Sequence, residues 1–477
     1  MFKYHYIFIL FSLVLTACDK PSAPVPPSKI STSVVDKNKV ITFVTMNSPS
    51  TYFINGENKL AGLEYDLARL FVADLGADYQ LKFIVVSDFT SVLPTLLTQK
   101  ADIAAADISI TEARKAVVTF SEPYYDVQQQ VVYNRDANPA PRSIKALTGQ
   151  TITVPSGTSF VERLQKINAK APLLAWQERP NSSSASLIEA LANNEIDYTI
   201  ADNHLLSIMQ YHYPNVGMAF SIGEPEKIAW AFRKDGRADI AQKANQFLKK
   251  IKTNGVLLNL IDRYHGNTKR LNPFDVKSFL SASQHLLPKY VRLFKDAQEI
   301  TGIDWRLLAA ISYQESHWNT FNTSPTNVRG LMMLTEDTSD LMKVTDRLDP
   351  KQSIPAGAKY FLWLKERFSG RIEDPDRTYM ALASYNIGFG HVEDARILAQ
   401  RLKLNPDSWA DVKKTLLSLT QPKYYSKAKH GFCGCGAPII YTESIRSYYQ
   451  IMEKHQPKYD PEPYRIASAS QFKLSFN

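Results

Sequence analysis

The stretch "LLAAISYQESHWNTF" (residues 307–321) aims a glutamate at the buried side of a helix. Leu308 and Ile311 lie seven and four residues before Glu315, so helical spacing puts all three side chains on one face. Asp304 is a suitable N-cap for this helix. Two interpretations stay open here. Either Glu315 ends the helix and reaches water, or an apolar pocket keeps its carboxyl protonated, ready to act as a general acid.

Length and composition limit the kinds of protein that this chain can be. A chain of 477 residues is too long for one ordinary core, which predicts two or three domains. Its 44% hydrophobic and 22% charged residues are typical of a soluble globular protein. The formal net charge of +9 favours an anionic partner such as cell-wall polymer or lipid headgroups. Nucleic acid is the weakest option, because the sequence has no zinc-finger spacing and no Arg-rich arm. We expect no cofactor and no metal ion.

The N-terminus has the pattern of a secretory leader. A short basic start precedes an apolar run that is too short to span a bilayer, which predicts a signal peptide over residues 1–17. The ending "LTAC" matches the bacterial lipobox and predicts acylation of Cys18, with a chance cysteine as the alternative. The mature protein would then be anchored on the periplasmic face of the cell envelope. Asp19 leaves both the inner and the outer membrane open. The Pro- and Ser-rich stretch 18–39 predicts an extended tether.

Two different patterns of elements follow the tether. From residue 40 to 266, short β-branched runs alternate with helical stretches, which indicates an α/β domain with largely parallel sheets. From residue 285 to 455, strands vanish and amphipathic helices take over, which predicts a mainly α domain. The polar stretch between them predicts a linker over 267–284, and residues 456–477 remain as a C-terminal tail.

Four stretches of the first domain resemble the periplasmic solute-binding proteins of the amino-acid type. They are "GLEYDLARLF", "ADIAAADISITEARKAVVTFSEPYY", "VPSGTS" and "IDYTIADN". The resemblance implies two lobes that close around a free amino acid or a cell-wall peptide, with the second lobe inserted from about residue 137 to 222. Arg114 would grip the α-carboxylate, Ser109 would add contacts, and Asp202 would hold an ammonium group. The turn around Thr158 opens a helix whose free N–H groups can bind an anion. The alternative is that Arg114 and Asp202 are surface charges in ordinary turns.

Three stretches of the second domain resemble the lysozyme-like lytic transglycosylases. They are "AAISYQESHWN", "SPTNVRGLMMLT" and "ALASYNIGFGH", in the order and spacing of that family. Carried over residue by residue, the resemblance makes Glu315 the catalytic acid and base. The residues that it implies along the cleft are Ser324, Met332, Met333, Tyr385 and Asn386. Each has a structural alternative, because methionines often fill cores, a Ser before Pro can start a turn, and a Tyr-Asn pair can end a helix.

Together the two resemblances imply a lyase that cleaves peptidoglycan. Glu315 would protonate the oxygen between N-acetylmuramic acid and N-acetylglucosamine, and the muramyl C6 hydroxyl would then attack C1 to form a 1,6-anhydro ring. Since no water enters, one carboxylate suffices where hydrolases usually bring two. The first domain would sense its ligand and adjust access to the cleft, and the resemblance favours the outer membrane. The alternative is a lipid-anchored receptor that binds cell-wall glycan and peptides without cutting them.

One segment departs from the second resemblance. Before the last helix the family tends to carry a charged, Gly-containing segment, whereas this chain has "HGFCGCGAPIIYTES". Cys433 and Cys435 in this segment could form a strained disulfide or stay reduced, and the sequence does not decide between these states. Glu443 lies nearby and has no assigned role.

Overall fold

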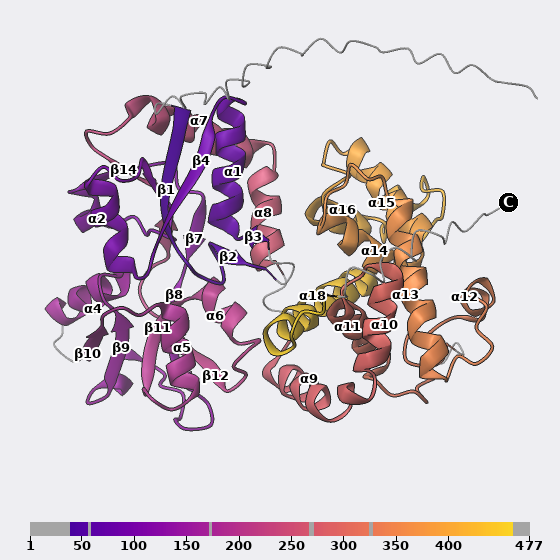
Figure 1. Ribbon diagram of the computed structural model, residues 1–477. Coiled ribbons are helices and arrows are strands. Elements are labelled where there is room, and N and C mark those ends of the chain that lie inside the picture. Colours follow the sequence, from indigo (N-terminus) through magenta and orange to yellow (C-terminus); the bar gives the residue numbers. More distant parts are fainter. Residues whose placement is uncertain (1–38, 56–58, 171–173, 267–270, 324–327, 461–477) are drawn as a thin grey trace, which may run out of the picture.

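Two bodies lie side by side in the computed structural model, the N-terminal domain in indigo to magenta and the C-terminal domain in orange to yellow (Figure 1). The structure describes residues 39–55, 59–170, 174–266, 271–323 and 328–460. The predicted signal peptide, the predicted acylation site Cys18, nearly all of the predicted tether, Ser324 and the tail beyond residue 460 lie outside the described residues. A two-lobed α/β domain followed by a helical domain confirms the predicted fold class.

The first lobe of the N-terminal domain is built on a five-stranded sheet. Its strands lie in the order β4 (Gln80–Val86), β1 (Val40–Met46), β5 (Ile103–Ala104), β14 (Ala231–Arg233) and β6 (Val118–Phe120). Ile41, Phe43 and Val44 of β1 have no exposed surface, because both faces of this central strand are covered. The strands β4, β1 and β5 run parallel, whereas β14 runs antiparallel to both of its neighbours.

The second lobe is built on another five-stranded sheet. Its strands lie in the order β10 (Ala175–Arg179), β9 (Thr151–Pro155), β11 (Tyr198–Asp202), β8 (Gln129–Asn134) and β12 (Val216–Ser221). Here β8 runs antiparallel to its neighbours. Both sheets are therefore largely parallel, as expected, with one strand in each that runs the other way: β14, which returns to the first lobe, and β8, which enters the second. Since β8 belongs to this sheet, the second lobe begins before residue 137, the boundary expected from the sequence.

Helices cover both sheets and carry the chain to the C-terminal domain. They are α1 (Leu63–Leu75), α2 (Val92–Leu97), α3 (Glu112–Lys115), α4 (Ser159–Lys170), α5 (Ser184–Ala192), α6 (Asn203–Met209), α7 (Ala238–Thr253) and α8 (Val256–His265). Two small ribbons pair β7 (Tyr125–Val127) with β13 (Glu226–Ile228), and β2 (Phe53–Ile54) with β3 (Leu60–Ala61). The last helix of this domain, α8, lies beside the C-terminal domain (Figure 1).

The described part of the C-terminal domain is helical. Its helices are α9 (Pro273–His285), α10 (Val291–Thr301), α11 (Trp305–Ser316), α12 (Glu336–Leu341), α13 (Pro350–Arg367), α14 (Asp376–Ile387), α15 (Phe389–Arg401), α16 (Trp409–Ser418), α17 (Pro422–Tyr425) and α18 (Gly436–His455). One apolar core joins them, and α11 and α18 pack on each other within it.

The structure corrects the linker that was expected over 267–284. Residues 273–284 form most of α9, which begins with a capping box at Asn272 and with Pro273 in its first turn. Val276 and Phe279 are buried in the core of the C-terminal domain, and the Phe279 ring stacks on that of Tyr448 with centroids 4.7 Å apart. A helix with a polar surface and two buried apolar residues has a sequence that resembles a linker.

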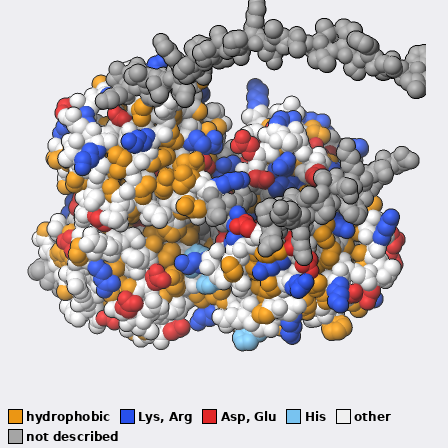
Figure 2. All heavy atoms as spheres, in the orientation of Figure 1, with side chains coloured by type: hydrophobic (Ala, Val, Ile, Leu, Met, Phe, Trp, Pro, Cys, Tyr) orange, Lys and Arg blue, Asp and Glu red, His pale blue; other side chains and the backbone are white. Residues whose placement is uncertain are grey.

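No helix of the described residues is long and apolar enough to cross a bilayer. On the face drawn in Figure 2, Lys and Arg side chains are scattered among Asp and Glu over both bodies. On this face, therefore, the net charge of +9 is not gathered into a single basic patch that would select one kind of partner.

Candidate functional site

Glu315 lies in the last turn of α11, on the face that it shares with Leu308 and Ile311. Both apolar side chains are fully buried. Asp304 caps the helix as predicted, because its side chain accepts a backbone N–H of the first turn. The hydroxyl of Tyr441 in α18 donates a 2.5 Å hydrogen bond to Glu315 Oε1. The carboxyl group therefore points inward, toward the packed helix α18.

Burial raises the pKa of Glu315 from 4.5 to about 7, and the hydrogen bond from Tyr441 offsets part of this rise. No carboxylate of the described residues contributes to the raised pKa of Glu315. A large fraction of Glu315 is therefore protonated at neutral pH, which is the state that a general acid needs. This geometry fits the apolar-pocket interpretation of the sequence and not the helix end that reaches water.

The predicted cleft residues near α11 have different surroundings. Met332 is fully buried, so its side chain fills the core. Its backbone carbonyl accepts a 2.8 Å hydrogen bond from the hydroxyl of Tyr385 at the end of α14. Met333 is half-buried with a φ of 46°, and Asn386 is exposed. Of the four described residues, the structure leaves Met333, Tyr385 and Asn386 accessible in part or in full.

The turn that carries the two methionines is tied to α11. The hydroxyls of Ser312 and Ser316 each donate a 3.0 Å hydrogen bond to the carbonyl of Leu331. Gly330 has a φ of 83°, and a Cβ there would lie 1.9 Å from the carbonyl oxygen of Arg347. Only glycine fits this approach. The turn is thus held rigidly against the helix that carries the glutamate.

Tyr441 is a contact of Glu315 that the sequence did not reveal. Tyr441, Ile445 and Tyr448 are all buried on one face of α18, and this spacing marks Tyr441 as an inward-facing residue. Its partner is 126 residues away in the chain, so periodicity alone cannot supply the pair.

The four residues predicted to bind a ligand in the N-terminal domain line one cavity between the lobes, the inter-lobe cavity. They are Ser109, Arg114, Thr158 and Asp202. Arg114 is buried in the short helix α3, and its guanidinium donates to the carbonyls of Ser109 in the first lobe and Gly157 in the second. These contacts do not match the alternative of surface charges in ordinary turns.

Asp202 faces this cavity from the N-cap of α6. Burial raises its pKa to about 7, and its Oδ1 atom has no hydrogen-bond partner. Two further cavity residues were missed from the sequence, Asp107 and His204, whose Oδ2 and Nε2 atoms are 3.1 Å apart. Burial opposes the charge of His204, but the Asp107 carboxylate raises the His204 pKa overall. Asp107 lies three residues after the end of β5. A polar residue just beyond the end of a strand is the sequence feature that could have identified it.

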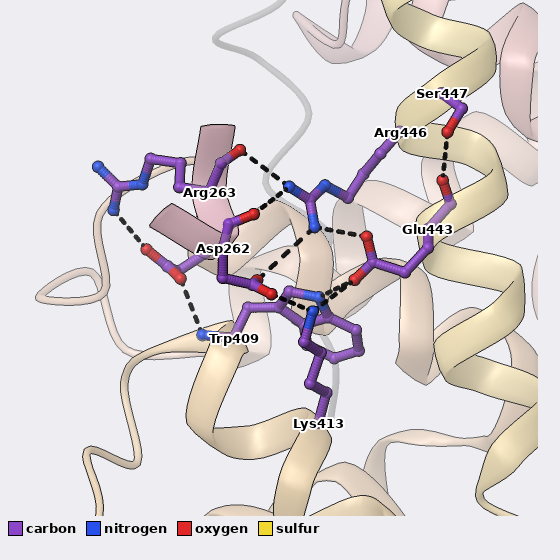
Figure 3. Close-up of polar contacts among 8 residues, drawn as sticks. Asp262, Arg263, Trp409, Lys413, Glu443, Arg446 and Ser447 are labelled. Carbon is purple, nitrogen blue, oxygen red and sulfur yellow. Dashed lines mark hydrogen bonds and ion pairs between the residues drawn. The ribbon is translucent and has the colours of Figure 1, made fainter. Parts of the chain in front are cut away.

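The two domains meet in a group of polar contacts that we call the interdomain cluster (Figure 3). Its members are Asp262 and Arg263 of α8, and Asp376, Trp409, Lys413, Glu443, Arg446 and Ser447 of the C-terminal domain. The Arg446 guanidinium donates to the backbone carbonyls of Asp262 and Arg263 at 3.1 and 2.9 Å, and pairs with Glu443 at 2.6 Å. Lys413 bridges the Asp262 and Glu443 carboxylates.

Helix α18 separates this cluster from Glu315. Glu443 follows Tyr441 by two residues, which places the two side chains about 200° apart around the helix. Tyr441 thus faces Glu315, while Glu443 contacts α16 and Arg446 contacts α8. The second lobe also reaches α18, because the buried Tyr211 hydroxyl lies 3.1 Å from the Ser447 hydroxyl. Both lobes therefore contact α18, the helix whose Tyr441 donates a hydrogen bond to Glu315.

Cys433 and Cys435, whose state the sequence left open, are joined by a disulfide in the structure. Their Cα atoms are 5.1 Å apart, and both residues are buried in the C-terminal core. Cys435 is the N-cap residue of α18. The bond therefore fixes the backbone where this helix begins.

Similarity to known proteins identifies the family of this two-domain chain. The model for bacterial extracellular solute-binding proteins of family 3 matches residues 40–267, and the transglycosylase SLT domain matches residues 292–406. A membrane-bound lytic murein transglycosylase F of Methylobacillus flagellatus is 52% identical, over 95% of this chain and 95% of that protein. Proteins of the same name from Nitrosospira multiformis and Pseudomonas putida are 41% and 40% identical, over 94% and 92% of this chain and 91% and 89% of theirs. The chain therefore belongs to the membrane-bound lytic murein transglycosylase F family.

Proposed function

We propose that this protein is a lyase that cleaves the β-1,4 bond between N-acetylmuramic acid and N-acetylglucosamine in peptidoglycan. The observation that carries the proposal is Glu315, a carboxyl on the inward face of α11 whose pKa burial raises to about 7. The names of the relatives and the SLT domain support the same reaction class. The residues proposed to bind the glycan beside Glu315 are Ser324, Met332, Met333, Tyr385 and Asn386.

The reaction needs one carboxyl group in two protonation states. Glu315 first gives its proton to the leaving glycosidic oxygen and becomes a carboxylate. That carboxylate then takes the proton of the muramyl C6 hydroxyl, whose oxygen attacks C1 and closes the 1,6-anhydro ring. The Tyr441 hydrogen bond stabilises the carboxylate between the two steps, and burial favours its return to the neutral acid. A hydrolase would need a second carboxylate to activate water.

The test is a digest of purified peptidoglycan by the soluble form without residues 1–18, beside Glu315→Gln, with the products weighed by mass spectrometry. We expect products ending in 1,6-anhydromuramic acid from the wild type and none from the variant. Reducing-end products that have taken up water would mean a hydrolase. Binding without any product would favour the receptor.

We propose further that the N-terminal domain binds an amino acid or a cell-wall peptide and thereby adjusts the activity. Arg114 would hold a carboxylate and Asp202 an ammonium group, while Ser109 and Thr158 would complete the inter-lobe cavity. Support comes from the contacts of both lobes with α18, since a change in the angle between the lobes would displace that helix.

Turnover with and without a peptidoglycan stem peptide tests this regulation in the wild type and two variants. Arg114→Gln should abolish the response because the ligand no longer binds. Asp262→Asn should bind ligand normally but respond less, because Lys413 loses an ion pair across the domain boundary. Equal rates with and without saturating ligand in the wild type would refute the proposed regulation.

The family name indicates an envelope protein associated with a membrane. We propose that the association is a lipid on Cys18, following a signal peptide over residues 1–17 and preceding a tether over 18–39, with the outer membrane favoured. The proposed binding domain comprises residues 40–266, and the proposed catalytic domain comprises residues 285–455. Mass spectrometry of the N-terminal peptide from the membrane fraction tests the lipid, and Cys18→Ser should release the protein.

A further inference from the structure

One row of side chains on α13 has no part in the function derived so far. Tyr360, Trp363 and Arg367 follow one another at intervals of three and four residues, so they lie along one face of the helix. The rings of Tyr360 and Trp363 are half-buried and stack with centroids 5.7 Å apart. From Tyr360 to Arg367 the row covers eight helical residues, a rise of about 10 Å.

The row begins at the proposed active site. The Tyr360 ring meets the Tyr385 ring edge-on, with centroids 5.4 Å apart. Tyr385 in turn lies close enough to Glu315 for the carboxyl to influence its pKa, which burial raises first of all. A glycan strand bound at Glu315 and Tyr385 would therefore reach the α13 row without leaving the protein surface.

Arg367 ends the row in an unusual setting. Its guanidinium carbon lies 4.7 Å from the Trp363 ring centroid and 4.0 Å from that of Phe389, the first residue of α15. The residue is nevertheless exposed. A guanidinium that rests on aromatic faces keeps its N–H edge free for hydrogen bonds in its own plane.

Two neighbouring arginines are neutralised, and Arg367 is not. Arg371 and Arg396 share the carboxylate of Asp407 at 2.8 and 2.7 Å, and Arg396 also pairs with Glu393. Within the described ranges, no ion pair joins Arg367 to a carboxylate. The protein thus positions this arginine with aromatic rings and leaves its charge unmatched, which is the arrangement of an anion-binding group.

We propose that Tyr360, Trp363, Phe389 and Arg367 form a second glycan-binding site, the α13 site, in which Arg367 binds a carboxylate of the peptidoglycan strand. The rings would pack against the apolar faces of sugars beyond those held at Glu315. The carboxylate has two sources: the stem peptide on an intact strand, and the lactyl group of muramic acid where the peptide has been removed. This inference rests on the proposed function, because it extends the same strand along the surface.

The test measures binding in the Glu315→Gln background, where no strand is cut. The probes are strands with stem peptides, strands stripped of peptides, and N-acetylglucosamine oligomers, which carry no carboxylate. Arg367→Gln should weaken binding of one or both carboxylated probes about five-fold and leave the neutral oligomers unchanged. The first two probes identify the source of the carboxylate. Trp363→Leu should weaken all three, because it removes ring surface and the support of Arg367.

Arg371→Gln is the matched control, since Arg371 is an exposed arginine of the same region with a carboxylate partner. Unchanged binding of both carboxylated probes by Arg367→Gln, an equal loss with Arg371→Gln, or an equal loss for the neutral oligomers would overturn the proposal. Failure of all three probes to bind would overturn it as well. The binding assay needs no cleavage. Wild-type protein that binds strands but forms no anhydro product would therefore refute the proposed reaction without contradicting the α13 site.

Discussion

Replacing Glu315 by Gln separates the chemistry of its carboxyl from its packing. The amide has nearly the same shape and stays neutral at every pH, so it copies the protonated acid. We expect Glu315→Gln to lose activity by a factor on the order of 10² to 10⁴, the contribution of a positioned general acid. The same change should stabilise the fold at alkaline pH, because a charged carboxylate is no longer formed in this desolvated setting.

The magnitude follows from the pKa of Glu315, which burial raises from 4.5 to about 7. Because the pKa of Glu315 is higher in the folded state, the stability that this group contributes is complete below its unfolded-state pKa of 4.5. That stability is lost as the pH rises through the folded-state pKa of about 7. Well above pH 7 the wild type should therefore have lost about 3 kcal/mol relative to the amide variant. Near pH 4.5 the two proteins should be almost equally stable. For a domain of this size the alkaline difference corresponds to about 6–12 °C in melting temperature.

The assay is thermal unfolding of both proteins between pH 5 and 9, together with wild-type turnover over the same range. Turnover should fall as the pH rises above about 7, because the acid form of Glu315 disappears. Glu373→Gln is the control, since Glu373 is exposed in the same domain. A melting difference between Glu315→Gln and wild type that does not change with pH would refute the reasoning, because it would mean that the carboxyl is not held in an apolar pocket.

Three other outcomes are expected. Tyr441→Phe removes the hydrogen bond that holds down the pKa of Glu315, so the alkaline limb of the rate profile should move to higher pH while the rate at its maximum falls. Replacing Cys433 and Cys435 by Ala should cost about 1–2 kcal/mol in unfolding free energy, because the disulfide closes a very short loop, and guanidinium unfolding measures it. If Asp202 binds a ligand ammonium, calorimetry should show affinity falling as the pH drops below about 7, since burial raises the Asp202 pKa to that value. The variant Asp202→Asn should bind weakly at every pH.

Much of the local structure was predictable because its causes are short in range. The Asp304 cap, the buried face of Leu308 and Ile311, and the parallel strands around β1 all follow from neighbouring residue types. The sequence misplaced α9 as a linker, because only Val276 and Phe279 distinguish it and their partners come from other helices. The start of the second lobe was misplaced for a similar reason, since β8 joins its sheet through pairing with β11.

By itself, the sequence determined which face of the helix carries Glu315, because helical periodicity and a cap fix that face within a few turns of chain. It also determined the order of the two domains, because alternating strands and helices give way to helices alone. Only the tertiary structure decided what Glu315 meets, since Tyr441 arrives from 126 residues away. In the same way it brought Asp107 to His204 across 97 residues and α8 to α18 across the domain boundary. Such pairs depend on how complete helices and sheets pack together, and no local pattern of residues encodes that packing.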